Sequence, residues 1–169
     1  MAETKFKGNP VTTAGNLPVK GSKAPGFRLV KSDLGEMGPE DLKGKKMILN
    51  IFPSLDTSVC ATSVRRFNQL AARLDNTVVL AVSKDLPFAH GRFCSTEGIT
   101  NVVTLSGFRD TAFGNDYGVL MTDGPLAGLY ARSVVVVGED GTVIYTEMVP
   151  DITQEPDYDS ALAALQPAR

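Results

Sequence analysis

The apolar residues of the chain fall into two patterns, short continuous runs and one stripe with helical spacing. The runs Met47–Phe52 and Thr77–Val82 are rich in branched side chains, which is typical of strands buried on both faces. Between them, apolar residues recur at intervals of 4, 3, 4 and 3, as one face of an α-helix requires. This stripe consists of Cys60, Val64, Phe67, Ala71 and Leu74. The order predicts a strand, a helix and a second strand.

Shorter runs and turn signals predict the remaining elements. Asp85 is a candidate N-cap, and Pro87 suits the first turn of a helix that reaches about Cys94. A Gly-Asn-Pro turn predicts an N-terminal β-hairpin over about residues 4–14. The other predicted elements are strands over 27–30, 101–105, 132–137 and 142–149 and short helices over 110–116 and 157–165. Alternating strands and helices that end in a hairpin predict a single α/β domain over 1–169, with a mixed central β-sheet flanked by helices.

Composition narrows the function classes. The 169 residues include 17 Lys and Arg against 19 Asp and Glu, a net charge of −2, so nucleic-acid or acidic-membrane partners lack an electrostatic basis. The longest apolar run, Ser133–Val137, is far shorter than the ~20 residues of a membrane helix. No apolar stretch of signal-peptide length occurs in the first twenty residues, so we expect a cytoplasmic protein. One His and two Cys cannot form a four-ligand zinc site or a disulfide-dense scaffold.

Cys60 lies at the predicted start of the helix that follows the first buried strand. With Thr57 as the N-cap, Cys60 is the third helical residue, and its sulfur lies near free backbone N–H groups and the positive end of the helix dipole. That environment favours the thiolate, the nucleophilic form of cysteine. Cys60 also begins the apolar stripe, so a small buried hydrophobe is the alternative. The Thr57 hydroxyl likewise suits either a helix cap or a hydrogen-bonding partner of the thiolate.

The residues around Cys60 resemble those of a known family. Pro53, Thr57 and Cys60 form the Pro-x-x-x-Thr-x-x-Cys pattern of peroxiredoxins. More narrowly, the chain is similar to the bacterial thiol peroxidase subfamily from about residue 6 to the C-terminus. The segments that carry this resemblance are Gly8–Val11, Asn50–Ser54, Asp56–Thr57, Arg66–Leu70, Asp85–Ala89, Arg92–Cys94 and Asp123–Leu126. The resemblance implies a thioredoxin-like fold with an N-terminal β-hairpin.

Cys94 follows Cys60 by 34 positions, near the end of the next predicted helix. From the residues alone it is a partner in a structural disulfide, worth roughly 3–4 kcal/mol, or a second inert core thiol. The resemblance implies instead the resolving cysteine of an atypical two-cysteine mechanism within one subunit. One cysteine at a helix start and one near a helix end need not lie within the ~7 Å Cα separation that a disulfide requires. We therefore expect local unwinding around one or both cysteines during the cycle.

Arg132 begins the apolar strand over 132–137, where an arginine is commonly a solvated end residue. The resemblance implies instead the active-site arginine, whose charge would stabilise the Cys60 thiolate and whose planar donors would hold peroxide oxygens. Arg109 and Arg92 are interpreted as ion-pair or surface residues. His90, the only histidine, lies four residues before Cys94 and so beside it on a helix. We expect an exposed His90 rather than the base of a Cys-His hydrolase.

These residues together predict a thiol-dependent peroxidase that needs no metal, flavin or haem. Cys60 attacks a peroxide and becomes a sulfenic acid, Cys94 condenses with it, and an external dithiol reduces the disulfide. Thr57 and Arg132 would position the peroxide, and Pro53 would shield the pocket. The resemblance implies thioredoxin as the reductant, a homodimer, and organic hydroperoxides in preference to hydrogen peroxide.

Two other functions stay open. One is a thiol–disulfide exchanger or redox chaperone, although the second sulfur of a Cys-x-x-Cys pair is missing because Ser63 occupies that position. The other is a non-enzymatic module whose cysteines only pack in the core.

Overall fold

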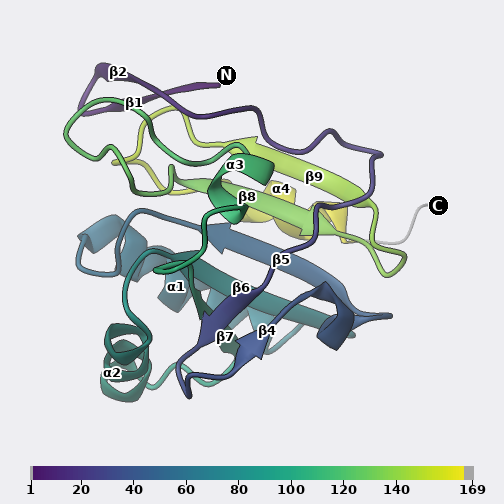
Figure 1. The fold of residues 1–169 in the computed structure, drawn as a ribbon. Coiled ribbons are helices and arrows are strands. Elements are labelled where there is room, and N and C mark those ends of the chain that lie inside the picture. Colours follow the sequence, from purple (N-terminus) through teal and green to yellow (C-terminus); the bar gives the residue numbers. More distant parts are fainter. Residues whose placement is uncertain (1, 166–169) are drawn as a thin grey trace.

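A computed structural model of the protein describes residues 2–165, and its centre is a seven-stranded sheet in the order β4-β3-β7-β6-β5-β8-β9 (Figure 1). The three strands β5, β6 and β7 are parallel, whereas β3, β4, β8 and β9 pair antiparallel with their neighbours. The sheet strands are β3 (Leu29–Lys31), β4 (Glu36–Met37), β5 (Lys46–Ile51), β6 (Thr77–Ser83), β7 (Val102–Ser106), β8 (Ser133–Val137) and β9 (Val143–Met148). This arrangement confirms the expected mixed central sheet.

Different helices pack against the two faces of the sheet. The parallel strands are joined by crossover helices, α1 (Ser58–Ala71) between β5 and β6 and α2 (Pro87–Glu97) between β6 and β7. Residues of α1, α2 and the closing helix α4 (Tyr158–Ala164) share one apolar cluster with the sheet, which contains both cysteines. The opposite sheet face packs against α3 (Phe113–Asp116) and a cluster of aromatic side chains that includes Tyr117 and Tyr130. A short 3-10 helix, η1 (Pro39–Leu42), precedes β5.

A separate two-stranded sheet forms the N-terminal hairpin, β1 (Glu3–Phe6) with β2 (Asn9–Thr12) (Figure 1). Its turn is Lys7-Gly8, where both residues have positive φ, so the predicted hairpin is confirmed while Asn9 and Pro10 belong to the strand. The Thr4 hydroxyl donates to the Val149 carbonyl at 2.8 Å, and the Ile152 amide donates to the Lys5 carbonyl at 2.8 Å. The hairpin thus supports the segment that follows β9.

Two predicted elements differ from the structure. The strand predicted over 27–30 is β3, which begins two residues later and ends one residue later. The N-cap of α2 is Leu86 rather than Asp85, because the Asp85 carboxylate bonds to residues outside the helix. The same helix continues past Cys94 to Glu97 and ends where Gly98 adopts the left-handed conformation at φ 67°. Within residues 2–165, no helix has the length and apolar content to cross a membrane.

Candidate active site

Cys60 is the third residue of α1, which begins at Ser58 after a loop that leaves the end of β5. Thr57 is the N-cap residue by backbone geometry, with φ −100° and ψ 143°, as predicted. Its exposed side chain does not cap the helix, since the hydroxyl donates to the Ser54 carbonyl at 3.0 Å. Pro53 is buried in the same loop. The Cys60 side chain is fully buried and belongs to the apolar cluster beneath α1.

Arg132 meets Cys60 beneath this helix. Its Nη2 donates to the Cys60 sulfur at 3.1 Å, and its Nε donates to the Ile152 carbonyl at 2.8 Å. β8 runs antiparallel to β5, and Ser133 pairs with Ile51, the last residue of β5. Arg132 directly precedes Ser133, so it lies beside the start of the loop that leads from β5 to Cys60. Only 1% of Arg132 is exposed, so the interpretation as a solvated strand end is wrong. The structure therefore joins two of the predicted site residues.

The charge of Arg132 bears on the chemistry of the Cys60 sulfur that it contacts. A buried guanidinium is costly unless a counter-charge and hydrogen-bond acceptors surround it. Among residues 2–165, no carboxylate forms an ion pair with Arg132, and its Nη1 is buried without a hydrogen-bond partner. The Cys60 sulfur is the group beside it that can become an anion. The contact thus places a cation with a further unpartnered donor, Nη1, beside the Cys60 sulfur.

Cys94 lies in a different environment on α2. It is half-buried, it is not disulfide-bonded, and it packs against the apolar cluster that contains Cys60. Burial raises the pKa of the Cys94 thiol, an effect that a hydrogen bond with Thr104 partly opposes. Cys94 is therefore a protonated thiol near neutral pH, whereas the Cys60 sulfur lies beside a permanent positive charge.

His90 is fully buried, so its predicted exposure is wrong. Its Nε2 lies 2.8 Å from the Ser83 hydroxyl and 4.0 Å from the Asp85 carboxylate. Burial lowers the pKa of His90 to about 4, an effect that the Asp85 charge partly opposes. His90 is thus a neutral interior residue at pH 7, and its ring packs toward β6 rather than toward Cys60.

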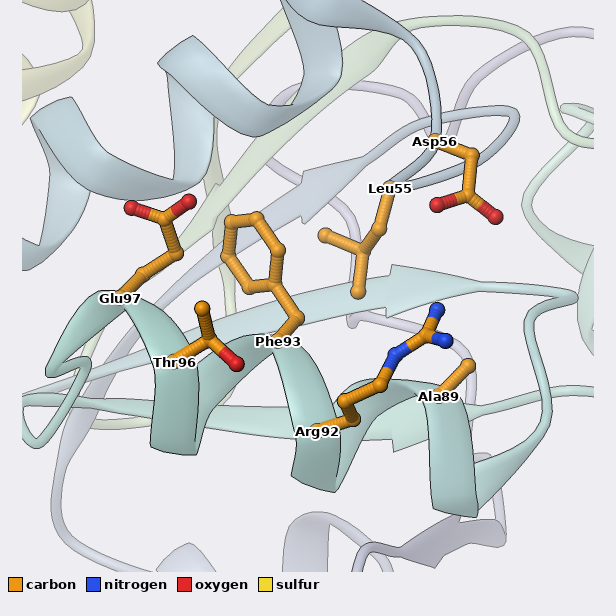
Figure 2. A pocket seen from close by; sticks show the side chains of 7 residues that line it. All are labelled: Leu55, Asp56, Ala89, Arg92, Phe93, Thr96 and Glu97. Carbon is orange, nitrogen blue, oxygen red and sulfur yellow. The ribbon is translucent and has the colours of Figure 1, made fainter.

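The two remaining arginines lie outside the Cys60 site. Arg109 pairs with Glu36 at 3.4 Å, which confirms the expected ion pair. Arg92 is exposed and lines a pocket of about 130 Å³ between α2 and the loop before α1. Figure 2 shows the Phe93 ring and the Arg92 guanidinium rising from α2 toward Leu55 and Asp56. This pocket therefore separates the two segments that carry the cysteines.

Sequence reasoning missed two groups that shape the site. One is the Ile152 carbonyl, which orients Arg132 and has no signal in a side-chain pattern. The other is Asp85, whose carboxylate accepts hydrogen bonds from the loop before Cys60. Asp85 belongs to the segment Asp85–Ala89, which carries the family resemblance, and this was the signal that could have pointed to it.

Comparison with known proteins agrees with this geometry. The Redoxin family model matches residues 19–162. The thiol peroxidase of Corynebacterium glutamicum is 58% identical over 165 residues, which cover 98% of this chain and 99% of that protein. The thiol peroxidase of Mycobacterium tuberculosis is 57% identical over 165 residues, with the same coverage.

Solved structures show the same fold. A peroxiredoxin-like protein from Aquifex aeolicus superposes with a TM-score of 0.91 at 39% identity, covering 96% of this chain and 95% of that one. A thiol peroxidase from Chromobacterium violaceum, at 21% identity, has a TM-score of 0.88, covering 95% and 93% of the two chains. The mixed sheet, its flanking helices and the N-terminal hairpin thus form a thioredoxin-like fold, as expected. The chain therefore belongs to the redoxin family and, within it, to the bacterial thiol peroxidases.

Proposed function

We propose that this peroxidase reduces organic hydroperoxides and hydrogen peroxide through a Cys60 sulfenic acid and an intrasubunit Cys60–Cys94 disulfide. The observation that carries the proposal is the hydrogen bond from Arg132 to the Cys60 sulfur inside a buried site. The permanent cation beside Cys60, and the burial that raises the pKa of the Cys94 thiol, support different roles for the two sulfurs.

In the first step, the Cys60 thiolate attacks the terminal oxygen of the hydroperoxide. The O–O bond breaks as the S–O bond forms, so the sulfur loses two electrons to the peroxide and the departing alkoxide takes a proton to become an alcohol, or water from hydrogen peroxide. The free Nη1 of Arg132 donates to the separating oxygens, where negative charge develops. Thr57 positions the peroxide from the loop, and Pro53 shields the site from water.

In the second step, the Cys94 sulfur attacks the Cys60 sulfenic acid, forming the S–S bond and releasing water. Because Cys60 lies near the start of α1 and Cys94 near the end of α2, we propose that local unwinding of one or both helices brings the two sulfurs together in this step. A dithiol then passes two electrons to the disulfide by thiol–disulfide exchange and restores both thiols.

The family likeness supports thioredoxin as this dithiol, a homodimeric assembly, and a cytoplasmic location, where thiols are kept reduced. The exchanger alternative has no specific support. Ser63, where an exchanger would have its second cysteine, is buried and donates to the Cys60 carbonyl at 2.8 Å.

A coupled assay tests the proposal. Reduced protein, thioredoxin and its reductase are supplied with NADPH and either hydrogen peroxide or a long-chain organic hydroperoxide. We expect NADPH oxidation with both peroxides, faster with the organic one, and none with Cys60→Ser. We expect Cys94→Ser to lose thioredoxin-dependent turnover and to accumulate sulfenic acid at Cys60. Turnover that persists in Cys94→Ser at the wild-type rate would contradict the two-cysteine cycle.

A further inference from the structure

We propose that Asp85 is a positioning residue. Its carboxylate holds the loop before Cys60, the Cys60 loop, against the N-terminal end of α2, the Cys94 helix. One carboxylate in this way controls the rates of both chemical steps. This role rests on the two-cysteine cycle proposed above. Asp85 lies between the end of β6 and Leu86, the N-cap of α2. Its side chain is only 11% exposed.

The Asp85 carboxylate binds the Cys60 loop directly. Oδ1 accepts a hydrogen bond from the Ser54 hydroxyl at 2.9 Å, and Oδ2 accepts one from the Leu55 amide at 2.8 Å. Ser54 in turn organises the loop, because its carbonyl accepts from the Thr57 hydroxyl at 3.0 Å and from the Thr57 amide at 3.2 Å. A chain of hydrogen bonds therefore runs from Asp85 through Ser54 to the N-cap of the Cys60 helix.

The same carboxylate is anchored on the side of α2. Oδ2 also accepts from the Ser83 hydroxyl at 2.6 Å, and the Asp85 carbonyl accepts from the Ser106 hydroxyl at 2.5 Å. The single Ser83 proton goes to Asp85, so the Ser83 oxygen accepts from Nε2–H of neutral His90 at 2.8 Å. His90 lies inside α2, one helical turn before Cys94. Asp85 thus connects the Cys60 loop to the body of the Cys94 helix.

A polar contact farther along the two cysteine-bearing helices is more exposed than the Asp85 network. At the end of α2, Glu97 accepts from Arg65 of α1 at 3.0 and 2.8 Å. This pair is exposed, with 44% of the Arg65 and 31% of the Glu97 side chain accessible, so water and salt screen it. The nearly buried Asp85 network is therefore the stronger barrier to separating the loop from α2.

This connection has opposite consequences for the two steps. While the bonds hold, Thr57 and Cys60 keep the arrangement in which Arg132 contacts the sulfur, which favours attack on peroxide. Formation of the Cys60–Cys94 disulfide requires the two segments to move, and that movement breaks the bonds from Ser54 and Leu55 to Asp85. Weakening the network should therefore slow the peroxide step and speed the disulfide step. A residue with a merely structural role would not move the two rates in opposite directions.

The test compares Asp85→Asn with Ser54→Ala, which leaves the Asp85 carboxylate in place and removes the bond from the Ser54 hydroxyl to Asp85 together with the one that this hydroxyl accepts from the Asp56 amide at 3.1 Å. The control is Asp140→Asn, because that carboxylate also accepts a backbone hydrogen bond, from the Thr142 amide at 3.0 Å, but it lies in the turn between β8 and β9, at the opposite end of β8 from Arg132. Reduced proteins are mixed rapidly with hydrogen peroxide, quenched with an alkylating agent and resolved by mass. This yields separate rate constants for sulfenic acid and disulfide formation, and the fraction of Cys60 over-oxidised to sulfinic acid by excess peroxide.

We expect Asp85→Asn to lower the rate of sulfenic acid formation about tenfold and to raise the rate of disulfide formation about threefold. Ser54→Ala should change both rates in the same directions by smaller factors, and less sulfinic acid should accumulate in both variants than in the wild type. If the two rates in both variants match those of Asp140→Asn, or if the two rates fall together, the role of Asp85 is overturned while the proposed function stands. A wild-type protein that forms no Cys60–Cys94 disulfide would overturn the proposed function and this role with it.

Discussion

The guanidinium of Arg132 and the sulfur of Cys60 are 3.1 Å apart, although 72 positions separate the two residues in the chain. Antiparallel pairing of β8 with β5 brings them to the same end of the sheet, and the Ile152 carbonyl holds the guanidinium in place. The hairpin braces the segment that contains Ile152, so a feature at the start of the chain contributes to the orientation of the arginine.

Replacement of Arg132 should lower the rate of the peroxide step. Arg132→Lys keeps the charge, but a lysine cannot donate in the planar fork that reaches Ile152 and Cys60 together, so we expect a loss of about 10- to 100-fold. Arg132→Met removes both charge and donors and should cost about 100- to 1000-fold. Competition kinetics with a second peroxide-consuming thiol protein measure the rate constant for each variant. Rates within twofold of the wild type would show that the contact has no catalytic role.

His90 should make stability depend on pH. Its pKa in the folded protein is about 4, against about 6.5 in an unfolded chain, so between these values the unfolded state binds more protons. Stability should therefore be complete above about pH 6.5 and decline by about 3 kcal/mol as the pH falls to 4. Urea unfolding at pH 7, 5.5 and 4 measures this decline. The variant His90→Gln should lack this part of the decline, and an unchanged pH dependence in the variant would contradict the assignment.

Cys94 should control the pH dependence of disulfide formation. Burial raises the pKa of its thiol, so the reactive thiolate becomes more abundant as the pH rises. In single-turnover reactions we expect the rate of disulfide formation to increase steadily from pH 6 to about 9. The sulfenic acid formed in the same reaction provides the internal reference. A disulfide-formation rate that is flat over this range would indicate that opening of the helices, rather than the Cys94 thiolate, limits the step.

Oxidation should not stabilise the protein. A structural disulfide that closes a loop of this length would raise the melting temperature, because it restricts the unfolded chain. A catalytic disulfide that forms only after α1 or α2 unwinds gives up native packing and should leave the melting temperature equal or lower. Calorimetry of the reduced and fully oxidised proteins distinguishes these outcomes, with Cys94→Ser as the control that cannot form the disulfide. A clear rise on oxidation would support a structural role for the cysteines.

Local patterns in the sequence were sufficient to predict the elements that position Cys60. The branched run that became β5 and the spacing of 4 and 3 residues in α1 predicted the strand and the helix, and Thr57 as the N-cap placed Cys60 third in that helix. The contact between Arg132 and Cys60 was not available from such signals. It depends on pairing between β5 and β8, which are far apart in the chain, and only the family resemblance pointed to it.

Two predictions for α2 were wrong, because local sequence rules do not include contacts with residues elsewhere in the fold. Asp85 before Pro87 satisfies the N-cap preference, yet its carboxylate bonds to Ser54, 31 positions away, and Leu86 is the N-cap residue. His90 was misread because the apolar residues of α2 do not mark its buried face: Phe88 is 68% exposed, whereas His90 is buried beside the Ser83 hydroxyl. Both errors concern residues whose partners lie elsewhere in the fold, and these are the residues that connect the two cysteine segments.

The most direct test of the account is to add one equivalent of peroxide to the reduced protein and follow both sulfurs by mass. The two-cysteine cycle predicts that one equivalent removes both free thiols and leaves a Cys60–Cys94 disulfide within one chain, while Cys94→Ser stops at a Cys60 sulfenic acid. Loss of a single thiol in the wild type, or a disulfide that joins two chains, would contradict the central claim.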